Sequence, residues 1–483
     1  MTTCSTARQT RRTRARSTPG SSRVVTLDGE PTGQCHDLCR RLPRVDVWER
    51  TRTQESPNRS QTPSWSRFDA TSTRHPEPAW CEFYTTARIV AELERRDLDA
   101  VHLGETIHDG HRRGVPDEET LSEWRDRALA AGADPDVIDE IGEGYTGAVA
   151  VAERGEGPVV GLRVDIDALP ITESTADDHL PAAEGFRSDN EGYMHACGHD
   201  AHATFGVGVI DRVLDSEFDG TLKLFFQPGE EQVVGAEPMV ASGLLDDVDY
   251  MFAAHVGLDH PTGEVIGGMG GFLAVSHLRA DFTGEPSHAG GHPEQGRNAV
   301  QAAATAIQNL YAIPRHADGA TRVNAGIVGG GTGTNIVPEE AFIEGEVRGE
   351  TTELMEYTDE KAETVLQSAA EMHEVDVETT RLGRAPSAES DQALVELVTA
   401  TAEDAGVDSV VERDELGGSE DATYMMRAVQ ENGGLATYVG IGTDHPGGHH
   451  TATFDVAEAS LGVGVDVLSE AVVRTAAERP GAD

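Results

Sequence analysis

Short apolar runs alternate with longer amphipathic stretches over most of the chain. The runs are rich in β-branched and aliphatic residues and predict strands. Stretches such as 85–98, 203–214 and 395–405 repeat apolar residues at helical spacing and predict helices. This alternation predicts an α/β sheet. The four clearest strand segments are 159–164, 221–226, 249–254 and 435–441.

Beyond residue 273 the order of the predicted elements changes to strand, helix, two strands, helix and strand. This β-α-β-β-α-β order is typical of a ferredoxin-like domain. The α/β pattern then resumes, so we expect a first domain in two parts, 68–272 and 384–483, interrupted by an inserted domain at 273–383. The inserted elements are strands at 274–282, 321–328, 341–347 and 375–381 and helices at 296–312 and 352–372.

Residues 1–67 have a different composition from the rest of the chain. They are rich in Arg, Ser, Thr and Pro and carry a net charge of +7, whereas the remaining residues carry −54. With no sustained apolar period they bury too little to offset the entropy of ordering, so we expect a disordered Arg-rich segment. The alternatives are a nucleic-acid tail, half of a zinc site at Cys35 and Cys39 that lacks a second ligand pair, or translated upstream sequence absent from the native protein.

The whole chain has a formal net charge of −47. This charge disfavours nucleic acid and anionic membrane surfaces as partners. The acidic, lysine-poor composition indicates a salt-rich cytosol or an ordinary acidic protein. No run of roughly 18 apolar residues predicts a membrane span, and no apolar segment follows Arg11 and Arg12 to complete a secretory signal. Five scattered cysteines fit a reducing compartment, so we expect a cytoplasmic protein.

Ionisable residues follow each of the four predicted strands. Asp165 and Asp167 follow the first, Glu230 and Glu231 the second, and His255 the third. The fourth leads into Asp444, His445, His449 and His450. Because ligands bind beyond the carboxyl ends of strands in open α/β sheets, we expect these groups to converge.

The densest group of potential metal ligands lies at 195–202 and contains one cysteine, three histidines and one aspartate. Gly198 would let the backbone turn so that Cys197 and His199 both face an ion such as zinc or manganese. The alternative is a small buried cysteine beside helix-capping polar residues. In the Glu230–Glu231 pair, one carboxylate could bind metal while its neighbour takes a proton from water.

Eight motifs occur in an order that resembles the M20 metallopeptidase family, in its aminoacylase-like amidohydrolase branch. Further segments, GVPDEETL (114–121) and GYTGAVAV (144–151), are most similar to the group of aminobenzoyl-glutamate hydrolase A subunits. The eight motifs are LRVDIDALPI (162–171), MHACGHDAH (194–202), FFQPGEE (225–231), AAHVG (253–257), PSHAGGHPEQGRNAV (286–300), NIVP (335–338), GSEDATYMM (418–426) and GHHTATFD (448–455).

The resemblance implies a metal-dependent exopeptidase-like catalytic domain with an inserted ferredoxin-like dimerisation or lid domain. It also implies two divalent metal ions, zinc or manganese, bridged by a cysteine. Asp165 is not expected to be a ligand, and His195 and His202 are expected to support the ligands by hydrogen bonds. The implied metal ligands are Cys197, His199, Glu231, His255 and His450.

The resemblance also implies roles in catalysis and substrate binding. Glu230 would be the general base, and Asp167 would orient a metal-binding group. His288 of the inserted domain would donate to the oxyanion in the site of a partner subunit. Asn335 and Arg348 would bind the substrate, with Arg348 suited to a carboxylate.

The activity implied is hydrolysis of an N-acyl amino acid, with p-aminobenzoyl-glutamate, giving p-aminobenzoate and glutamate, as the leading substrate. A general N-acyl-amino-acid or indole-acetyl-amino-acid deacylase is the alternative within hydrolases. A non-catalytic regulatory subunit of a heteromeric amidohydrolase is the alternative from another class. We expect a homodimer, or a heterodimer with a homologous subunit.

Overall fold

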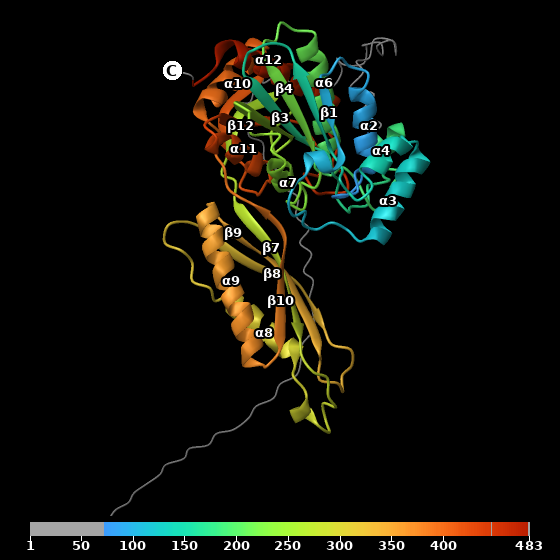
Figure 1. Ribbon diagram of the computed structural model, residues 1–483, viewed down its shortest axis with the longest axis vertical. Helices are drawn as coiled ribbons and strands as arrows, with labels where there is room; N and C mark the ends of the chain where they lie inside the picture. The colour runs from blue at the N-terminus through green and yellow to red at the C-terminus, as the bar shows by residue number, and fades with distance from the viewer. Residues whose placement is uncertain (1–71, 446, 482–483) are drawn as a thin grey trace, which may run out of the picture. The chain divides into compact units, whose positions relative to one another are not determined.

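The computed structural model describes residues 72–445 and 447–481, and the predictions for residues 1–67 fall outside the described residues. Its larger sheet has eight strands in the order β1-β2-β4-β3-β5-β12-β6-β11 (Figure 1). The neighbours β4, β3, β5 and β12 are parallel, so their carboxyl ends lie at one edge of the sheet. The strand bounds are β1 Ala100–His102, β2 Ala148–Glu153, β3 Val159–Asp165, β4 Thr221–Gln227, β5 Tyr250–Val256, β6 Glu264–Gly270, β11 Ser409–Glu415 and β12 Leu435–Ile441.

Helices cover both faces of this sheet. Helices α2, α6, α10 and α12 share a hydrophobic core with strand residues such as Leu162 and Phe252, while α7 and α11 share a second core with Met251. Burial on both faces explains why the central strands read as continuous apolar runs. The helix bounds are α2 Phe83–Leu93, η1 Gly104–Ile107, α3 Glu118–Ala131, α4 Pro135–Glu140, α5 Leu180–Glu184, α6 His199–Leu214, α7 Ala236–Ala241, α10 Gln392–Asp404, α11 Ala422–Glu431 and α12 Glu458–Glu478.

A smaller antiparallel sheet, in the order β10-β7-β9-β8, is built from the inserted segment. Helices α8 and α9 cover one of its faces (Figure 1) and share a core with strand residues such as Leu278 and Ile343. We propose domain limits at 273 and 383: β7 begins one residue after the first limit, and β10 continues to Ala385, two residues beyond the second. The bounds are β7 Ala274–Thr283, η2 Pro293–Gln295, α8 Ala299–Leu310, β8 Thr321–Gly330, β9 Glu340–Gly349, α9 Thr352–Met372 and β10 Asp376–Ala385.

Two details of the sequence prediction were wrong. The first helix ends at Leu93 and not at residue 98. Near this end the Arg96 guanidinium binds the Glu92 carbonyl and pairs with Asp211 at 2.7 Å. Four strands, β1, β2, β6 and β11, were also missed. β11 illustrates why, because it is an edge strand of mainly exposed, charged residues with little apolar patterning.

Among the helices of residues 72–445 and 447–481, none has both the length and the apolar character needed to cross a bilayer.

His108, at the end of η1, is a buried histidine that the fold holds neutral. Its Nε2 lies 2.8 Å from the Thr146 carbonyl, and its ring packs edge-on against Trp80. Because a carbonyl can only accept, Nε2 carries the proton of the neutral ring. Burial lowers the pKa of His108 from 6.5 to about 4.

This depressed pKa predicts a loss of stability in acid. Between pH 6.5 and 4, His108 is mostly protonated in the unfolded chain and mostly neutral in the folded chain. The free energy of unfolding therefore rises with pH across this window. The contribution of His108 should fall by about 3 kcal/mol as the pH falls from 6.5 to 4. Denaturant titrations should show a smaller pH slope in His108→Gln, whereas exposed His111→Gln should keep the wild-type slope. Equal slopes in both variants would contradict the assignment.

Candidate metal and catalytic site

The carboxyl ends of the parallel strands deliver the groups that the sequence singled out. β3 ends at Asp165 and is followed by Asp167, while β4 leads to Glu230 and Glu231. His255 is the penultimate residue of β5. The loop after β12 brings in His450, and His199 is the first residue of α6.

Two backbone turns complete this arrangement. Gly198 has φ +84°, and a Cβ atom there would lie 2.4 Å from the Val256 side chain. The predicted turn at Gly198 is therefore confirmed, and only glycine fits it without strain. His450 also has a positive φ, 59°, and its N–H donates to the Ala196 carbonyl at 2.8 Å. This bond ties the loop after β12 to the loop that carries Cys197.

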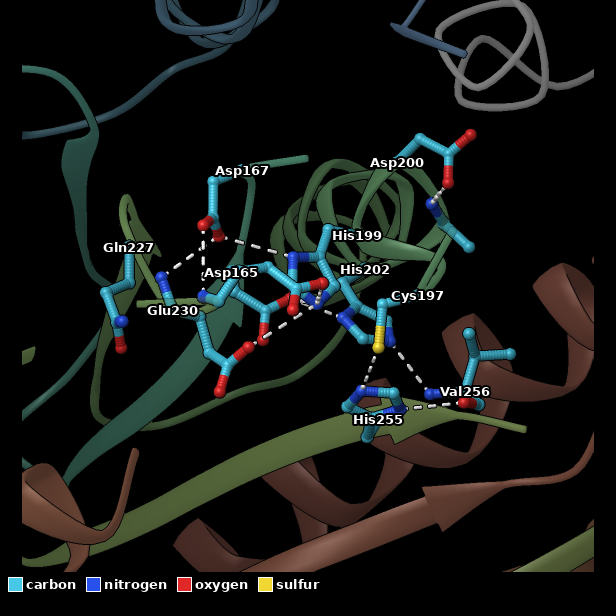
Figure 2. Close-up of polar contacts among 12 residues, drawn as sticks. Asp165, Asp167, Cys197, His199, Asp200, His202, Gln227, Glu230, His255 and Val256 are labelled. Carbon is cyan, nitrogen blue, oxygen red and sulfur yellow. Dashed lines mark hydrogen bonds and ion pairs between the residues drawn. The ribbon is translucent and has the colours of Figure 1, made fainter. Parts of the chain in front are cut away.

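Potential metal-ligand atoms gather around Cys197. Cys197 Sγ lies 3.4 Å from His255 Nε2, as Figure 2 shows. His450 Nε2 lies 3.5 Å from Glu231 Oε2, and His199 Nε2 lies 3.8 Å from Glu231 Oε1. Five groups of three residues have ligand atoms within 4.8 Å of one another: Cys197–His199–His255, Cys197–Glu231–His450, His199–Glu230–Glu231, Asp165–His199–His202 and Asp165–Glu230–Glu420. The first two groups have only Cys197 in common, and together they contain the five residues predicted as metal ligands.

The backbone carbonyl and N–H of Val256 orient three imidazole rings. Its carbonyl accepts from His255 Nδ1 at 2.7 Å and from His449 Nε2 at 3.2 Å. Its N–H donates to His202 Nε2 at 2.8 Å, which leaves the proton of His202 on Nδ1, facing Asp165 (Figure 2). Since His255 donates from Nδ1, its Nε2 carries the lone pair that faces Cys197. The tautomer of His255 is thus the one a metal ligand needs.

Asp167 orients the two adjacent glutamates and the histidine beside them. Its two carboxylate oxygens accept the backbone N–H groups of Glu230 and Glu231, each at 3.0 Å. Its Oδ1 also lies 3.3 Å from His199 Nδ1 (Figure 2). One buried carboxylate therefore fixes the turn that carries both glutamates and the ring of a candidate ligand.

The site concentrates buried acidic groups. Burial raises the pKa of Glu230 well above its usual range, and the charges of Glu420 and Glu231 raise it further. Burial also raises the pKa of Glu231 to about 8 and raises that of the Cys197 thiol. A nearby positive charge would favour the ionised form of each group. The cluster is therefore suited to bind cations.

The donor atoms fit divalent metal ions. His199 Nε2 and Glu231 Oε1 are buried and make no hydrogen bond to any residue that the structure describes. Leaving buried polar atoms unpaired costs free energy, and metal coordination would remove that cost. A mixture of thiolate, imidazole and carboxylate ligands suits zinc or manganese better than magnesium or calcium.

A buried ion network beneath the site was missed by the sequence analysis. The Arg163 guanidinium contacts Asp165 at 2.7 Å, Glu420 at 3.0 Å and Asp421 at 3.2 Å, and its side chain is fully buried. Asp421 in turn accepts the backbone N–H groups of 235 and 236 at the start of α7. A lone arginine within an apolar strand was the available signal, because a buried cation needs acidic partners.

A cavity of about 460 Å³ opens at this cluster. Its wall includes Cys197, Glu230 and, from the inserted sheet, Arg348. His288 and Asn335 do not line it: they are exposed, and the backbones of Ala289 and Asn335 are hydrogen-bonded at 2.9 Å. The structure thus places Arg348 beside the metal-ligand cluster and places His288 with Asn335 elsewhere on the inserted segment.

Two known hydrolases are similar in sequence to this chain over most of its length. The chain is 40% identical over 415 residues to the A subunit of p-aminobenzoyl-glutamate hydrolase from Escherichia coli K12, covering 85% of this chain and 95% of that protein. It is 41% identical over 401 residues to indole-3-acetyl-aspartic acid hydrolase of Enterobacter agglomerans, covering 82% and 92%.

Two solved structures share the fold of this chain over most of its length. The structure of an aminobenzoyl-glutamate utilization protein from Klebsiella pneumoniae superposes with a TM-score of 0.74 at 35% identity, covering 86% of this chain and 97% of that one. A dinuclear metal-binding peptidase of the M20 family from Bacillus subtilis superposes with a TM-score of 0.59 at 25% identity, covering 86% and 98%.

The comparisons confirm the predicted fold class and the predicted class of enzyme, a metal-dependent amidohydrolase. The sequence profile of Peptidase family M20/M25/M40 matches residues 161–474, which include the five candidate metal ligands and Glu230. On this match and on relatives about 40% identical over most of its length, the chain belongs to peptidase family M20/M25/M40.

Proposed function

We propose that this chain hydrolyses the amide bond of an N-acyl amino acid, with p-aminobenzoyl-glutamate as the substrate. The observation that carries the proposal is the shared position of Cys197 between two ligand groups, beside Glu230, on the wall of a cavity of about 460 Å³. The names of the Escherichia coli relative and of the Klebsiella pneumoniae structure support the substrate. The presence of both base and ligands supports catalysis by this chain over a purely regulatory role.

Indole-3-acetyl-aspartate is a second candidate substrate. The relative named for its hydrolysis is 41% identical to this chain, close to the 40% of the aminobenzoyl-glutamate relative. Both compounds join an aromatic acyl group to an amino acid with two carboxylates. The proposal therefore covers the N-acyl derivatives of glutamate and aspartate.

Two divalent ions, zinc or manganese, would be held by five residues. Cys197 is central to this set, because the groups Cys197–His199–His255 and Cys197–Glu231–His450 have only Cys197 in common. The ions would supply Lewis-acid chemistry, polarising the amide carbonyl and making a nearby water more acidic. The proposed ligands are Cys197, His199, Glu231, His255 and His450.

Glu230 would move the proton during hydrolysis. Its carboxylate would accept a proton from the attacking water and return it to the departing amine nitrogen. The hydrogen bonds from the 230 and 231 backbone to Asp167 would keep the Glu230 carboxylate in place as its charge changes. Arg348, on the cavity wall, would hold a carboxylate of the substrate. Asn335 lies beside His288 and away from this cavity, so it would contact the substrate backbone in the site of a neighbouring subunit.

His288 would stabilise the oxyanion from a neighbouring subunit. The N–H groups of Gly290 and Gly291 donate to His288 Nδ1 at 3.1 and 3.0 Å, so the neutral ring carries its proton on Nε2 and can donate from there. Its absence from the wall of the cavity supports a role in the site of a second protomer. The partner would be a second copy or, as the names of the A-subunit relatives suggest, a homologous protein.

The net charge of −47 supports a working environment of high salt, where screening reduces self-repulsion within the chain. We place the protein in the cytoplasm, on the evidence of its few scattered cysteines.

Removing the Cys197 thiolate should weaken metal binding. We expect Cys197→Ala to bind zinc or manganese about 100-fold more weakly or worse, since even the loss of a ligand's hydrogen-bond partner costs about 10–100-fold. Metal content after dialysis, measured by mass spectrometry, would check this. Cys81→Ala is the matched control, because Cys81 is also buried but lies in the hydrophobic core. Equal metal content in the two variants would exclude Cys197 as a ligand.

Glu230→Gln should abolish catalysis without emptying the site. We expect kcat for p-aminobenzoyl-glutamate to fall by about 10²–10⁴-fold, the usual contribution of a general base. Metal content should stay at the wild-type level. Release of p-aminobenzoate gives the rate, and Glu123→Gln, which alters an exposed ion pair with Arg127, should retain full activity. A Glu230→Gln enzyme with wild-type kcat would remove Glu230 from the mechanism.

A shared active site should be restored by mixing two inactive variants. In a mixed dimer of His288→Ala and Glu230→Gln chains, one site receives an intact Glu230 and an intact His288. Random exchange should then restore about a quarter of wild-type activity. Native mass spectrometry would verify the exchange. Mixed dimers without activity would show that His288 does not act across the dimer.

A further inference from the structure

The inserted sheet forms one wall of the cavity. This wall contains one ionisable side chain, His277, that has no role in the proposed mechanism. Val275 and His277 on β7 and Arg348 on β9 line the cavity from this sheet. Arg348 has been assigned one carboxylate of the substrate, but an N-acyl derivative of glutamate or aspartate has two. The second carboxylate needs a partner of its own, because an unpaired charge in a partly buried site is costly.

Arg348 is held in place with part of its donor capacity free. Its Nε and one terminal nitrogen each donate to Glu346 at 2.9 Å, and the other terminal nitrogen donates to Ser419 at 3.2 Å. A guanidinium has five N–H groups. Two therefore lack a partner among the residues that the structure describes, and both belong to terminal nitrogens that can bind a carboxylate.

His277 is attached to the same acidic residue. It lies directly opposite Glu346 in the β7–β9 pairing, and its Nε2 is 3.5 Å from Glu346 Oε2. Its side chain is 32% exposed, so it remains accessible from the cavity. Glu346 thus lies between His277 and Arg348 and fixes both on one face of two paired strands. Groups on strands hold their positions more accurately than groups on loops.

The charges around this wall favour an anion. Arg322 on β8 lies directly opposite Arg348 in the β8–β9 pairing. Like charges in that position destabilise a sheet, and a bound anion would relieve the repulsion. The larger domain lines the cavity with the exposed acids Asp259 and Glu415. A carboxylate would be repelled there, whereas Arg322 and Arg348 carry one more positive charge than the Glu346 carboxylate between them offsets.

We propose that His277 binds the side-chain carboxylate of the substrate, beside the Arg348 guanidinium that holds the other carboxylate, so that the enzyme selects N-acyl derivatives of acidic amino acids. The inference rests on the proposed function and identifies His277 as the residue that recognises the amino-acid side chain of the substrate. Glu346 is a positioning residue in this arrangement, because it contacts both His277 and Arg348.

Comparison of a charged and an uncharged substrate tests the proposal. p-Aminobenzoyl-glutamine has the shape of p-aminobenzoyl-glutamate but lacks the side-chain charge. The ratio of kcat/KM for the glutamate over the glutamine substrate should fall roughly tenfold in His277→Gln, as expected for one lost charged hydrogen bond. The change should appear mainly in KM. A merely structural effect would lower both rates together and leave the ratio unchanged, which would overturn the proposal.

His260→Gln is the matched control. His260 lines the same cavity, but both of its ring nitrogens are occupied, by Glu264 at 2.6 Å and by Asp414 at 3.2 Å. This histidine is not free to bind a carboxylate, so its variant should keep the wild-type ratio. A fall of the ratio in His260→Gln equal to that in His277→Gln would contradict the assignment to His277.

Binding of the free amino acids separates this proposal from the proposed function. Titration calorimetry of the metal-loaded wild type should show tighter binding of glutamate than of glutamine, and His277→Gln should reduce that preference. If wild type hydrolyses neither substrate yet binds glutamate selectively through His277, the proposed function fails and the selectivity stands. Equal affinities for the two amino acids in wild type would overturn the selectivity.

Discussion

The buried guanidinium of Arg163 is the interaction on which the geometry of the site depends. It balances Asp165, Glu420 and Asp421 in a space without exposed side-chain surface at either Arg163 or Asp165. Through Asp165 it reaches His202 and the Val256 peptide, and through Asp421 it reaches the start of α7. Loss of the cation would leave uncompensated buried acids, which typically costs about 3–5 kcal/mol. One side chain is thus connected to His202 and the Val256 backbone on one side and to the start of α7 on the other.

Much of the fold could be predicted from the sequence. The strands of the parallel block and the elements of the insertion could be located because each buries an apolar face with its own period. β11 could not be found in this way, since an edge strand whose side chains face solvent carries no such pattern. The end of the first helix, at Leu93, could not be predicted from the sequence either. Near that end, Arg96 pairs with Asp211, a residue far away in the sequence.

The candidate site was predictable to a similar extent. Asp167 and the glutamate pair could be located because ionisable residues directly follow apolar runs, and Cys197 because it lies in a dense group of potential metal ligands at 195–202. The pairing of Arg163 with Glu420 and Asp421 joins residues more than 250 positions apart, and single-sequence patterns do not report contacts at that separation. The same holds for His277, whose role can be inferred only when β7 pairs with β9 and places it opposite Glu346.

The Val256 peptide has a consequence for how this centre tolerates genetic change. The atoms that align three imidazoles belong to the main chain, so almost any codon at this position leaves them intact. Only proline would delete the donor. The aliphatic side chain is constrained by the packing of the hydrophobic core instead. A scan of substitutions would therefore find position 256 governed by volume and shape, although its amide and carbonyl are part of the machinery.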